Sequence, residues 1–497
     1  MIALKDFVKV VDGEFISGDP HALIRGVSTD TRTLGKGDCF FAIKGTGETA
    51  RDGHDFIKDA VIKDASVIVF SKDDISIGGD EKILLGFPAL VKVKDTLRAL
   101  GDYAKYVRSH FGGKVICVVG SNGKTTVKNM IYSILVAADA RAHKSPRNYN
   151  NLIGLPLTIL SMPQEDGEVD YLVLEAGISV AGEMSRLGEI AAPDIAVITS
   201  VGREHLEGLG DMETVFKEET EIFRHLKDNK GIAVINMDDS RLADFAAKNL
   251  RGDKNKSMRV VGFSLKGTHN SGASFPADMV VGCENISQSD EGVSFTIDCS
   301  HNRAEIFLKL NGIFNVSNAL AAAAVCFSLG VPLEKIKQGL ESFEAVPGRM
   351  QKFMLSNGCV IINDAYNANP DSMRASIAAF MEAYPRRNKI LVLGDMLELG
   401  TYSRQEHRSL GEFVMTLPFE EALLVGRCMR DAFERMKEID ENAPARHFNS
   451  VKELADEILG DRKYVSSADN AVFFKGSHSV GLEDIALKLY KIRALEI

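Results

Sequence analysis

The sequence lacks an excess of positive charge, which limits the partners that the protein can have. Its 59 Lys and Arg stand against 69 Asp and Glu, a formal net charge of −10 over 497 residues. Nucleic acids and anionic membranes attract proteins through a basic surface. We therefore expect no nucleic-acid partner and no membrane partner, whereas a local basic site for phosphate groups remains compatible with this charge balance.

Cysteine is also scarce, and long apolar runs are missing. The seven cysteines form no C-x-x-C pair, and no His cluster has zinc spacing, which argues against a disulfide framework or structural zinc and is typical of a reducing compartment. Charges at Lys5, Asp6, Lys9 and Asp12 interrupt the apolar core that a signal peptide needs. The most apolar helix candidate, 319–331, is too short to span a bilayer and indicates a buried helix. We expect a cytoplasmic monomer.

The length and the ordinary composition indicate several globular domains. A chain of 497 residues exceeds the size at which one core stops growing, and 45% hydrophobic residues is a usual globular value. Alternating strand and helix patterns favour an α/β fold with mostly parallel sheets. We predict a small α/β domain over 1–98, a central domain over 99–346 with an antiparallel elaboration over 252–310, and a doubly wound, Rossmann-like domain over 347–497. Pro and Gly place the hinge near 346–349.

The strongest local signal is a glycine loop between an apolar run and a helical pattern. The run 115–119 predicts a buried strand, Gly-Ser-Asn-Gly-Lys-Thr-Thr follows it, and apolar positions then recur at helical spacing. In such loops backbone N–H groups and a lysine hold phosphate oxygens, and a threonine hydroxyl binds Mg²⁺. The usual first glycine is Val118 here, so the loop is a shortened variant, and the alternative is a tight turn with an exposed lysine. The predicted nucleoside triphosphate site consists of Gly120, Ser121, Asn122, Gly123, Lys124, Thr125 and Thr126.

Polar residues follow further predicted strands of the central region. Glu175 and Asn236 each end an apolar run, and His205 lies in the loop after another. Ligands of open α/β sheets bind beyond the carboxyl ends of the strands, so these side chains should lie near the glycine loop. A carboxylate and an imidazole beside triphosphate oxygens are suitable Mg²⁺ ligands. The alternatives are a helix-capping Glu175 and a structural, hydrogen-bonded His205.

An Asp-Thr-Arg triplet lies in the N-terminal region, within the stretch 28–32. Arginine binds phosphate bidentately, so the triplet can hold a phosphate-bearing substrate. The alternative is a surface turn whose Asp and Thr side chains bond to the local backbone. Taken alone, the triplet favours the turn.

A series of separated motifs resembles the Mur ligases along nearly the whole chain. The Asn-Asn-x-Ile-Gly-x-Pro-Leu-Thr and Tyr-Asn-Ala-Asn-Pro stretches make it most similar to the type that joins D-alanyl-D-alanine to a UDP-N-acetylmuramoyl-tripeptide. The motifs occupy 120–126, 148–158, 202–207, 348–350, 364–373, 393–400 and 475–477.

The resemblance implies an ATP-dependent amide ligase that uses Mg²⁺ and acts in peptidoglycan precursor synthesis. The implied partners are the UDP-linked muramoyl peptide and D-alanyl-D-alanine, which react through an acyl phosphate. The resemblance also implies an N-terminal domain that holds the uridine-diphosphate sugar, a central phosphate-loop ATPase, and a mobile C-terminal domain that brings the amine.

The resemblance further assigns roles to residues. Lys124 should contact the β and γ phosphates, Thr125 a first magnesium ion, and Glu175 with His205 a second. The remaining nucleotide contacts are Asn236, Asn315 and Asn318 around adenine, Arg349 and Asp364 near phosphate and ribose, and Tyr366. The implied substrate contacts are Ser28, Asp30, Thr31 and Arg32 for the uridine end, Asn148 and Asn151 for the peptide or sugar, and Asn367 and Asn369 for the dipeptide.

Three positions depart from the family pattern. Glu219 stands where the family usually has a lysine, carbamylated so that it acts as a metal-binding carboxylate. Glu219 is therefore a candidate metal ligand and catalytic residue, and the alternative is a solvated helix residue. The family's Gly-x-His-Asn has Phe314 instead of His, and Asn363 replaces an Asp beside Asp364.

Because these departures fall at the active centre, other functions stay open. The runner-up is a divergent Mur-type ligase that adds another amino acid or peptide to a nucleotide-linked precursor, as in archaeal pseudomurein. Two alternatives from other classes are a phosphate-loop kinase or ATPase without amide chemistry, and a nucleotide-binding module that has lost catalysis.

Overall fold

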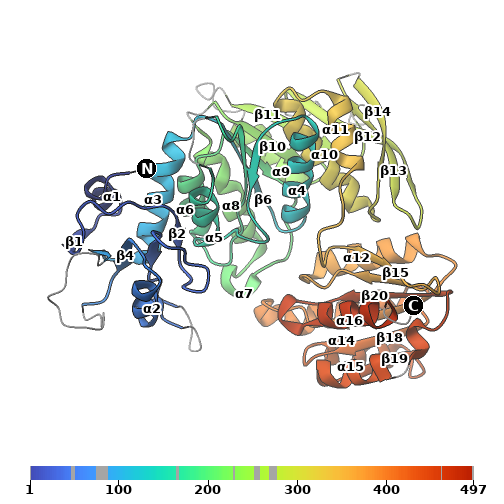
Figure 1. Cartoon of the computed structure of the whole chain (residues 1–497). Helices are drawn as coiled ribbons and strands as arrows, with labels where there is room; N and C mark the ends of the chain where they lie inside the picture. The colour runs from blue at the N-terminus through green and yellow to red at the C-terminus, as the bar shows by residue number, and fades with distance from the viewer. Residues whose placement is uncertain are drawn as a thin grey trace.

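Three β-sheets follow one another along the chain, each covered by helices, and the central one lies between the other two (Figure 1). The computed structural model describes residues 2–45, 51–73, 88–163, 167–227, 230–250, 258–267, 277–300, 302–460 and 462–494. The three sheets confirm the predicted α/β class with mostly parallel strands.

The N-terminal sheet has five strands in the order β1-β5-β4-β3-β2, with only β1 antiparallel to its neighbour. The strands are β1 (Glu14–Ser17), β2 (Val27–Ser28), β3 (Cys39–Phe41), β4 (Val67–Phe70) and β5 (Ala89–Lys92), and the helices are α1 (Leu4–Val10), α2 (Ile57–Ile62) and α3 (Thr96–His110). Helix α3 runs through the boundary predicted at residue 98 and carries the buried Arg108, whose guanidinium pairs with Asp194 of the next domain at 3.0 Å. This helix therefore joins the first two domains.

The central sheet has nine strands in the order β14-β13-β12-β11-β10-β9-β6-β8-β7. The six strands that follow one another as β11-β10-β9-β6-β8-β7 are parallel, and β11 is also parallel to β12. Beyond β12 the pairing is antiparallel, between β12 and β13 and between β13 and β14. The antiparallel elaboration predicted over 252–310 is thus confirmed over 279–308, as an extension of the same sheet, whereas β11 within that range is parallel to both of its neighbours. The strands are β6 (Lys114–Val119), β7 (Ala142–Lys144), β8 (Tyr171–Glu175), β9 (Ile195–Ile198), β10 (Ile232–Asn236), β11 (Arg259–Ser264), β12 (Met279–Gln288), β13 (Val293–Cys299) and β14 (Asn302–Leu308).

Helices cover both faces of the central sheet, so its inner parallel strands β6, β8, β9, β10 and β11 are buried on both sides over most of their length. One apolar core includes side chains of α4, α10 and α11, and the other includes side chains of α6 and α8. The predicted buried helix is α10, in which 319–326 are buried throughout. The helices are α4 (Lys124–Ala137), α5 (Gly154–Leu160), α6 (Glu183–Ala191), α7 (Leu206–Leu209), α8 (Met212–Glu221), α9 (Ser240–Phe245), α10 (Ile313–Ser328) and α11 (Leu333–Glu341).

The C-terminal sheet has six strands in the order β15-β16-β20-β17-β18-β19, and only β15 is antiparallel to its neighbour. The strands are β15 (Gln351–Met354), β16 (Val360–Asn363), β17 (Asn388–Gly394), β18 (Glu421–Val425), β19 (Ala445–Phe448) and β20 (Asn470–Lys475). The helices are α12 (Pro370–Ala383), α13 (Ser403–Met415), α14 (Met429–Ile439), α15 (Val451–Gly460) and α16 (Leu482–Ala494). The predicted doubly wound domain is therefore present.

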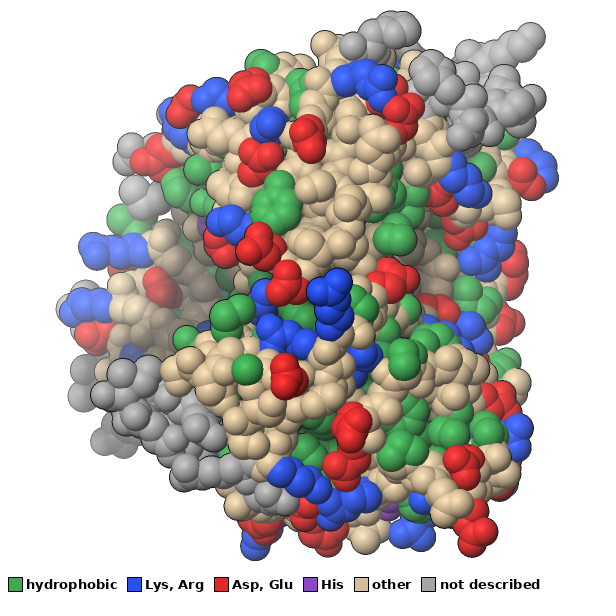
Figure 2. Space-filling view, turned by 90° about the vertical axis from the view of Figure 1, so that its right-hand side faces the viewer, with side chains coloured by type: hydrophobic (Ala, Val, Ile, Leu, Met, Phe, Trp, Pro, Cys, Tyr) green, Lys and Arg blue, Asp and Glu red, His purple; other side chains and the backbone are tan. Residues whose placement is uncertain are grey.

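The surface carries charges of both signs. On the face in Figure 2, Lys and Arg lie among Asp and Glu instead of forming one continuous basic field. Within the described residues, no helix combines the length and the apolar character that crossing a bilayer requires.

Candidate active site

The glycine loop connects the end of β6 to the start of α4 in the middle of the central sheet. Gly120 and Gly123 adopt φ angles of +119° and +87°, which L side chains rarely take. Space is also restricted, because a Cβ atom on Gly123 would lie 2.3 Å from Asn318 Oδ1. The loop thus leaves the positive end of α4 open to an anion.

Lys124 is the first residue of α4, and its ammonium group lies over the loop. Its Nζ donates to Gly120 O at 2.6 Å and is 3.3 Å from Glu204 Oε1. Burial by itself lowers the pKa of Lys124, but the nearby Glu204, Glu219 and Glu175 raise it above its ordinary value. Lys124 therefore stays a cation, surrounded by three carboxyl groups.

Glu175 ends β8 beside the loop and is buried. Its Oε1 accepts from Thr125 Oγ1 and Asn150 Nδ2, both at 3.1 Å. Lys128, one helical turn after Lys124, places its Nζ 3.0 Å from Glu175 Oε2, and both side chains are 1% exposed. A buried carboxylate requires such a counter-charge. Glu175 is thus held at the end of its strand, as predicted, and does not cap a helix.

Glu219 lies on α8, which covers the same region of the sheet. The side chain is completely buried, and neither of its carboxylate oxygens has a hydrogen-bond partner among the described residues. Burial raises the pKa of Glu219 to about 8, opposed by Lys124 and reinforced by Glu204. The interpretation of Glu219 as a solvated helix residue is therefore wrong. A buried carboxyl group whose oxygens lack a well-formed hydrogen bond and whose nearby cation is Lys124 can be satisfied by a proton or by a bound cation.

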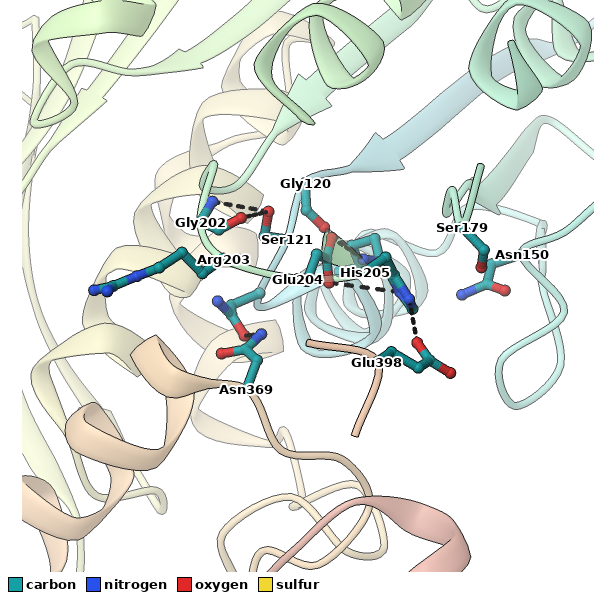
Figure 3. Close-up of polar contacts among 12 residues, drawn as sticks. Gly120, Ser121, Asn150, Ser179, Gly202, Arg203, Glu204, His205, Asn369 and Glu398 are labelled. Atoms are coloured by element: carbon teal, nitrogen blue, oxygen red, sulfur yellow. Dashed lines mark hydrogen bonds and ion pairs between the residues drawn. The ribbon is translucent and has the colours of Figure 1, made fainter. Parts of the chain in front are cut away.

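Glu204 and His205 follow β9 and complete the group of titratable side chains (Figure 3). Burial raises the pKa of Glu204 even though Lys124 contacts it. His205 Nε2 is 4.0 Å from Glu204 Oε2, and His205 Nδ1 pairs with Glu398 of the C-terminal domain. Carboxylates, a threonine hydroxyl and an imidazole form a donor set that suits a hard divalent cation such as Mg²⁺.

A cavity of about 370 Å³ opens on the other side of the loop. It combines polar loop residues with apolar side chains such as Leu265, Phe314 and Val346, as expected for a base-binding slot. The predicted nucleotide contacts that line it are Asn122, Gly123, Thr126, Asn236, Asn315, Asn318, Arg349 and Asp364.

Asp364 and Lys475 form a buried ion pair at the C-terminal wall of this cavity. Lys475 Nζ is 2.6 Å from Asp364 Oδ2, and Met350 N donates to the other carboxylate oxygen at 2.9 Å. Burial lowers the pKa of Lys475, opposed by Asp364. Tyr366 lies outside the cavity lining, with the Arg349 guanidinium 4.3 Å from its ring centroid.

The C-terminal domain docks directly on the glycine loop. Asn369 caps α12 and donates through Nδ2 to Asn122 Oδ1 at 2.9 Å. Arg203 bonds to Asp371 at 3.1 Å and to Glu406 at 2.8 Å. A second cavity, of about 220 Å³, lies in the same seam, with Glu204 and His205 on one side and Asn367, Asn369, 397–399 and 477–479 on the other. The carboxyl groups around Lys124, which we call the acidic cluster (Glu175, Glu204 and Glu219), therefore lie between two cavities.

Models of one protein family match successive parts of the chain. The "Mur ligase family, catalytic domain" model matches 23–108, the "Mur ligase middle domain" 118–326, and the "Mur ligase, glutamate ligase domain" 348–478. A UDP-N-acetylmuramoyl-tripeptide–D-alanyl-D-alanine ligase of Bacillus subtilis (strain 168) is 32% identical over 489 residues, covering 98% of each chain. The chain belongs to the Mur ligase family. The UDP-N-acetylmuramoyl-tripeptide–D-alanyl-D-alanine ligase of Escherichia coli (strain K12) is 31% identical, again over 98% of each chain.

Solved Mur ligase structures have the same fold. A MurF crystal structure from Acinetobacter baumannii has a TM-score of 0.82 at 28% identity, covering 98% of both chains. MurF of Thermotoga maritima, solved in complex with ADP, has a TM-score of 0.74 at 26% identity, covering 95% of this chain and 98% of that one. The family resemblance indicated by the motifs is thus confirmed.

Not every residue that the Mur ligase resemblance singled out lies at the two cavities. Ser28 and Asp30 belong to a local turn, in which Arg32 pairs with Asp30 at 2.6 Å and is largely exposed. Lys63 Nζ donates to Thr31 O. These contacts agree with the surface-turn interpretation, and a role at the uridine end stays a prediction. Asn151 Oδ1 accepts from Gly154 N at 2.8 Å at the start of α5.

Several residues of the site were not predicted from the sequence. Glu204 directly precedes the predicted His205, and Lys128 lies one helical turn after the predicted Lys124 on α4. Their spacing from these residues could have suggested both. Lys475 lies in a family motif but had received no role. Asn150 and Glu398 had no sequence signal beyond their motifs, because their partners are distant in the chain. Ser121 Oγ exchanges hydrogen bonds with the backbone of Gly202, and the nucleotide contact predicted for Ser121 stays a prediction.

The tight fit at Gly123 leads to a testable prediction. Gly123→Ala should weaken ADP binding, because the added Cβ displaces Asn318 and disturbs the loop. Gly182→Ala is the matched control, since Gly182 precedes α6 with φ +91° and has open space for a Cβ. Both changes should cost about 1 to 2 kcal/mol of folding free energy through backbone strain. Calorimetric ADP titration separates them: equal affinity in both variants would contradict this role of Gly123.

Proposed function

We propose that the protein is an ATP-dependent ligase that joins D-alanyl-D-alanine to a UDP-N-acetylmuramoyl-tripeptide in peptidoglycan precursor synthesis. The arrangement that carries the proposal is the phosphate loop with Lys124 and three buried carboxyl groups, set between a base-sized cavity and a smaller cavity at the domain seam. The curated relatives named above, which match this chain nearly end to end, support the same activity.

The reaction needs both cavities. An oxygen of the substrate carboxylate attacks the γ phosphorus of ATP, the bond from that phosphorus to the β-phosphate oxygen breaks, and ADP leaves. The amine then attacks the carbonyl carbon of the acyl phosphate, loses a proton, and displaces inorganic phosphate. Lys124 and the loop N–H groups stabilise the negative charge that two anionic reactants bring together. Docking of the C-terminal domain limits access of water, which would hydrolyse the acyl phosphate.

Mg²⁺ fits the site, because Glu219 presents two buried oxygens without hydrogen-bond partners among the described residues. We propose that Thr125, Glu175, His205 and Glu219 hold magnesium. The ion would neutralise charge on the phosphates and on the reacting carboxylate. Glu219 then provides directly the carboxylate that a carbamylated lysine provides elsewhere in the family.

The other roles follow the same division. We propose that ATP binds along Gly120–Thr126 and in the base-sized cavity, with Asn236, Asn315 and Asn318 toward adenine, Arg349 and Asp364 toward ribose and phosphate, and Tyr366 near the nucleotide. The amine would enter the smaller cavity, which Asn367 and Asn369 line. Ser28, Asp30, Thr31, Arg32, Asn148 and Asn151 would serve the UDP-linked substrate. We place the domain divisions near residues 98 and 346, and the reaction in the cytoplasm, where ATP is available.

A single assay tests this function. ADP release is measured with ATP, Mg²⁺, the UDP-linked tripeptide, and a panel of amino acids and dipeptides. We expect release only when both the carboxylate substrate and D-alanyl-D-alanine are present, and we expect hydroxylamine to trap the acyl phosphate as a hydroxamate. Release with ATP alone would indicate an ATPase, and absence of turnover with every amine would indicate a module without catalysis.

The same panel tests the runner-up function. A pseudomurein peptide ligase from Methanothermus fervidus shares the fold, with a TM-score of 0.61 at 20% identity. Preference for an amine other than D-alanyl-D-alanine would favour a divergent ligase. The test is needed because Glu219 and Phe314 depart from the family pattern at the active centre.

A further inference from the structure

Two residues in an uncommon backbone conformation meet across the domain seam. His205, just before α7, has φ +50°, and Glu398, in the loop after β17, has φ +63°. Left-handed conformations are infrequent for residues other than Gly, Asn, Asp and His, so the conformation of Glu398 is the less common of the two, and such residues are often found at functional sites. Here the conformation occurs on both sides of one contact, between His205 Nδ1 and the Glu398 carboxylate (Figure 3).

The contact determines how the imidazole is presented. A carboxylate at Nδ1 accepts a hydrogen bond from the Nδ1–H group, so that Nε2 has the free electron pair when the ring is neutral. His205 Nε2 faces Glu204, 4.0 Å from its Oε2 (Figure 3), and the other oxygen of that carboxylate is 3.3 Å from Lys124 Nζ. Histidines that bind metals are commonly oriented in this way by a carboxylate on the other nitrogen.

Glu398 reaches this position only from the docked C-terminal domain. Its carbonyl accepts from Glu207 N at 3.1 Å, so one residue contacts both His205 and the first turn of α7. Gly400 lies against the same turn, since a Cβ on it would be 3.2 Å from Glu207 Cα. The Glu398 side chain is 59% exposed, so it contributes little to the core. Its effect on the site would be exerted through its contact with His205.

We propose that Glu398 is a positioning residue that completes the cation site when the C-terminal domain docks, by fixing the ring orientation and tautomer of His205. The proposal rests on the ligase function and on the Mg²⁺ role of His205 given above. It links domain docking to cation binding: with the C-terminal domain away, His205 loses its orienting partner, and the acidic cluster holds the second cation weakly.

The test compares Glu398→Ala with Glu406→Gln. Glu406 is a matched control, because its carboxylate also crosses the seam, to Arg203, but does not contact His205. Mn²⁺ is titrated into the full chain saturated with ADP, and free Mn²⁺ is followed by electron paramagnetic resonance. We expect wild type and Glu406→Gln to bind a second Mn²⁺ equally, and Glu398→Ala to bind it about 10- to 100-fold more weakly.

A second measurement reports on the ring directly. In ¹⁵N-histidine NMR spectra of the ADP complex, wild-type His205 should show the Nδ1–H tautomer, and Glu398→Ala should show a mixture of tautomers. Glu398→Gln, whose amide oxygen can still accept from Nδ1, should restore most of the Mn²⁺ affinity.

Three results would overturn the proposal: unchanged Mn²⁺ affinity in Glu398→Ala, equal weakening in Glu406→Gln, which would reduce Glu398 to a domain clamp, or no second Mn²⁺ in wild type. The ligase function is judged separately, by ADP release from wild type with both substrates. An active wild type with unchanged Mn²⁺ binding in Glu398→Ala would therefore reject this inference alone.

Discussion

Lys124→Met should lower ADP release with the complete substrate set by about a thousand-fold, the scale seen when a main electrostatic contact to the reacting group is removed. The Lys124 ammonium group lies between the glycine loop and three carboxyl groups, and its side chain is 12% exposed. Without it the reacting anions repel each other, and Glu204 and Glu219 lose their counter-charge. Stopped-flow or coupled-enzyme measurement of ADP release checks the rate.

Lys217→Met provides the control for this substitution. Lys217 is exposed on α8, two residues before Glu219, so its loss changes the net charge equally without affecting the loop. Circular dichroism and urea unfolding must show that Lys124→Met is folded. A folded Lys124→Met variant with a rate within tenfold of wild type would contradict the role proposed for Lys124.

Glu219 should make the metal-free protein less stable as the pH rises. Burial raises the pKa of Glu219 from its ordinary value of 4.5 to about 8 in the folded chain. Between these values the folded state binds more protons than the unfolded state, so the free energy of unfolding falls with increasing pH. Relative to Glu219→Gln, wild type should lose at most about 1.4 kcal/mol per pH unit in this window.

Urea unfolding in EDTA at several pH values between about 5 and 8 measures this slope. Glu213→Gln is the control, because Glu213 lies exposed on the same helix and its substitution should leave the wild-type pH dependence unchanged. Equal pH dependence of wild type and Glu219→Gln would mean that Glu219 does not titrate in this range. We also expect Glu219→Gln to have lower ligase activity at every pH, since an amide is a poorer cation ligand than a carboxylate.

The nucleotide half of the site could be predicted because its signals are local. Strand, loop and helix are contiguous in 115–137, and the positive φ angles at Gly120 and Gly123 agree with the glycines that the motif requires. Glu175 and Asn236 could be placed because polar residues that end parallel strands gather at one edge of a sheet. The family motifs extended these assignments to the C-terminal domain.

The acidic cluster depended on packing that no local pattern describes. Glu219 was compatible with a solvated helix residue or a metal ligand; the packing of α8 against the sheet rules out the solvated residue, and the metal role stays a proposal. Lys128 pairs with Glu175, and Lys475 pairs with Asp364. Both ion pairs join residues that are distant in the chain.

The sequence by itself therefore determined the α/β class, the phosphate loop and the family, since periodicity and short motifs depend on neighbouring residues. The tertiary structure decided which carboxylates are buried and unpaired, and which residue of the C-terminal domain contacts His205. These properties depend on desolvation and on the docking of one domain against another, and both arise only after distant segments have packed together.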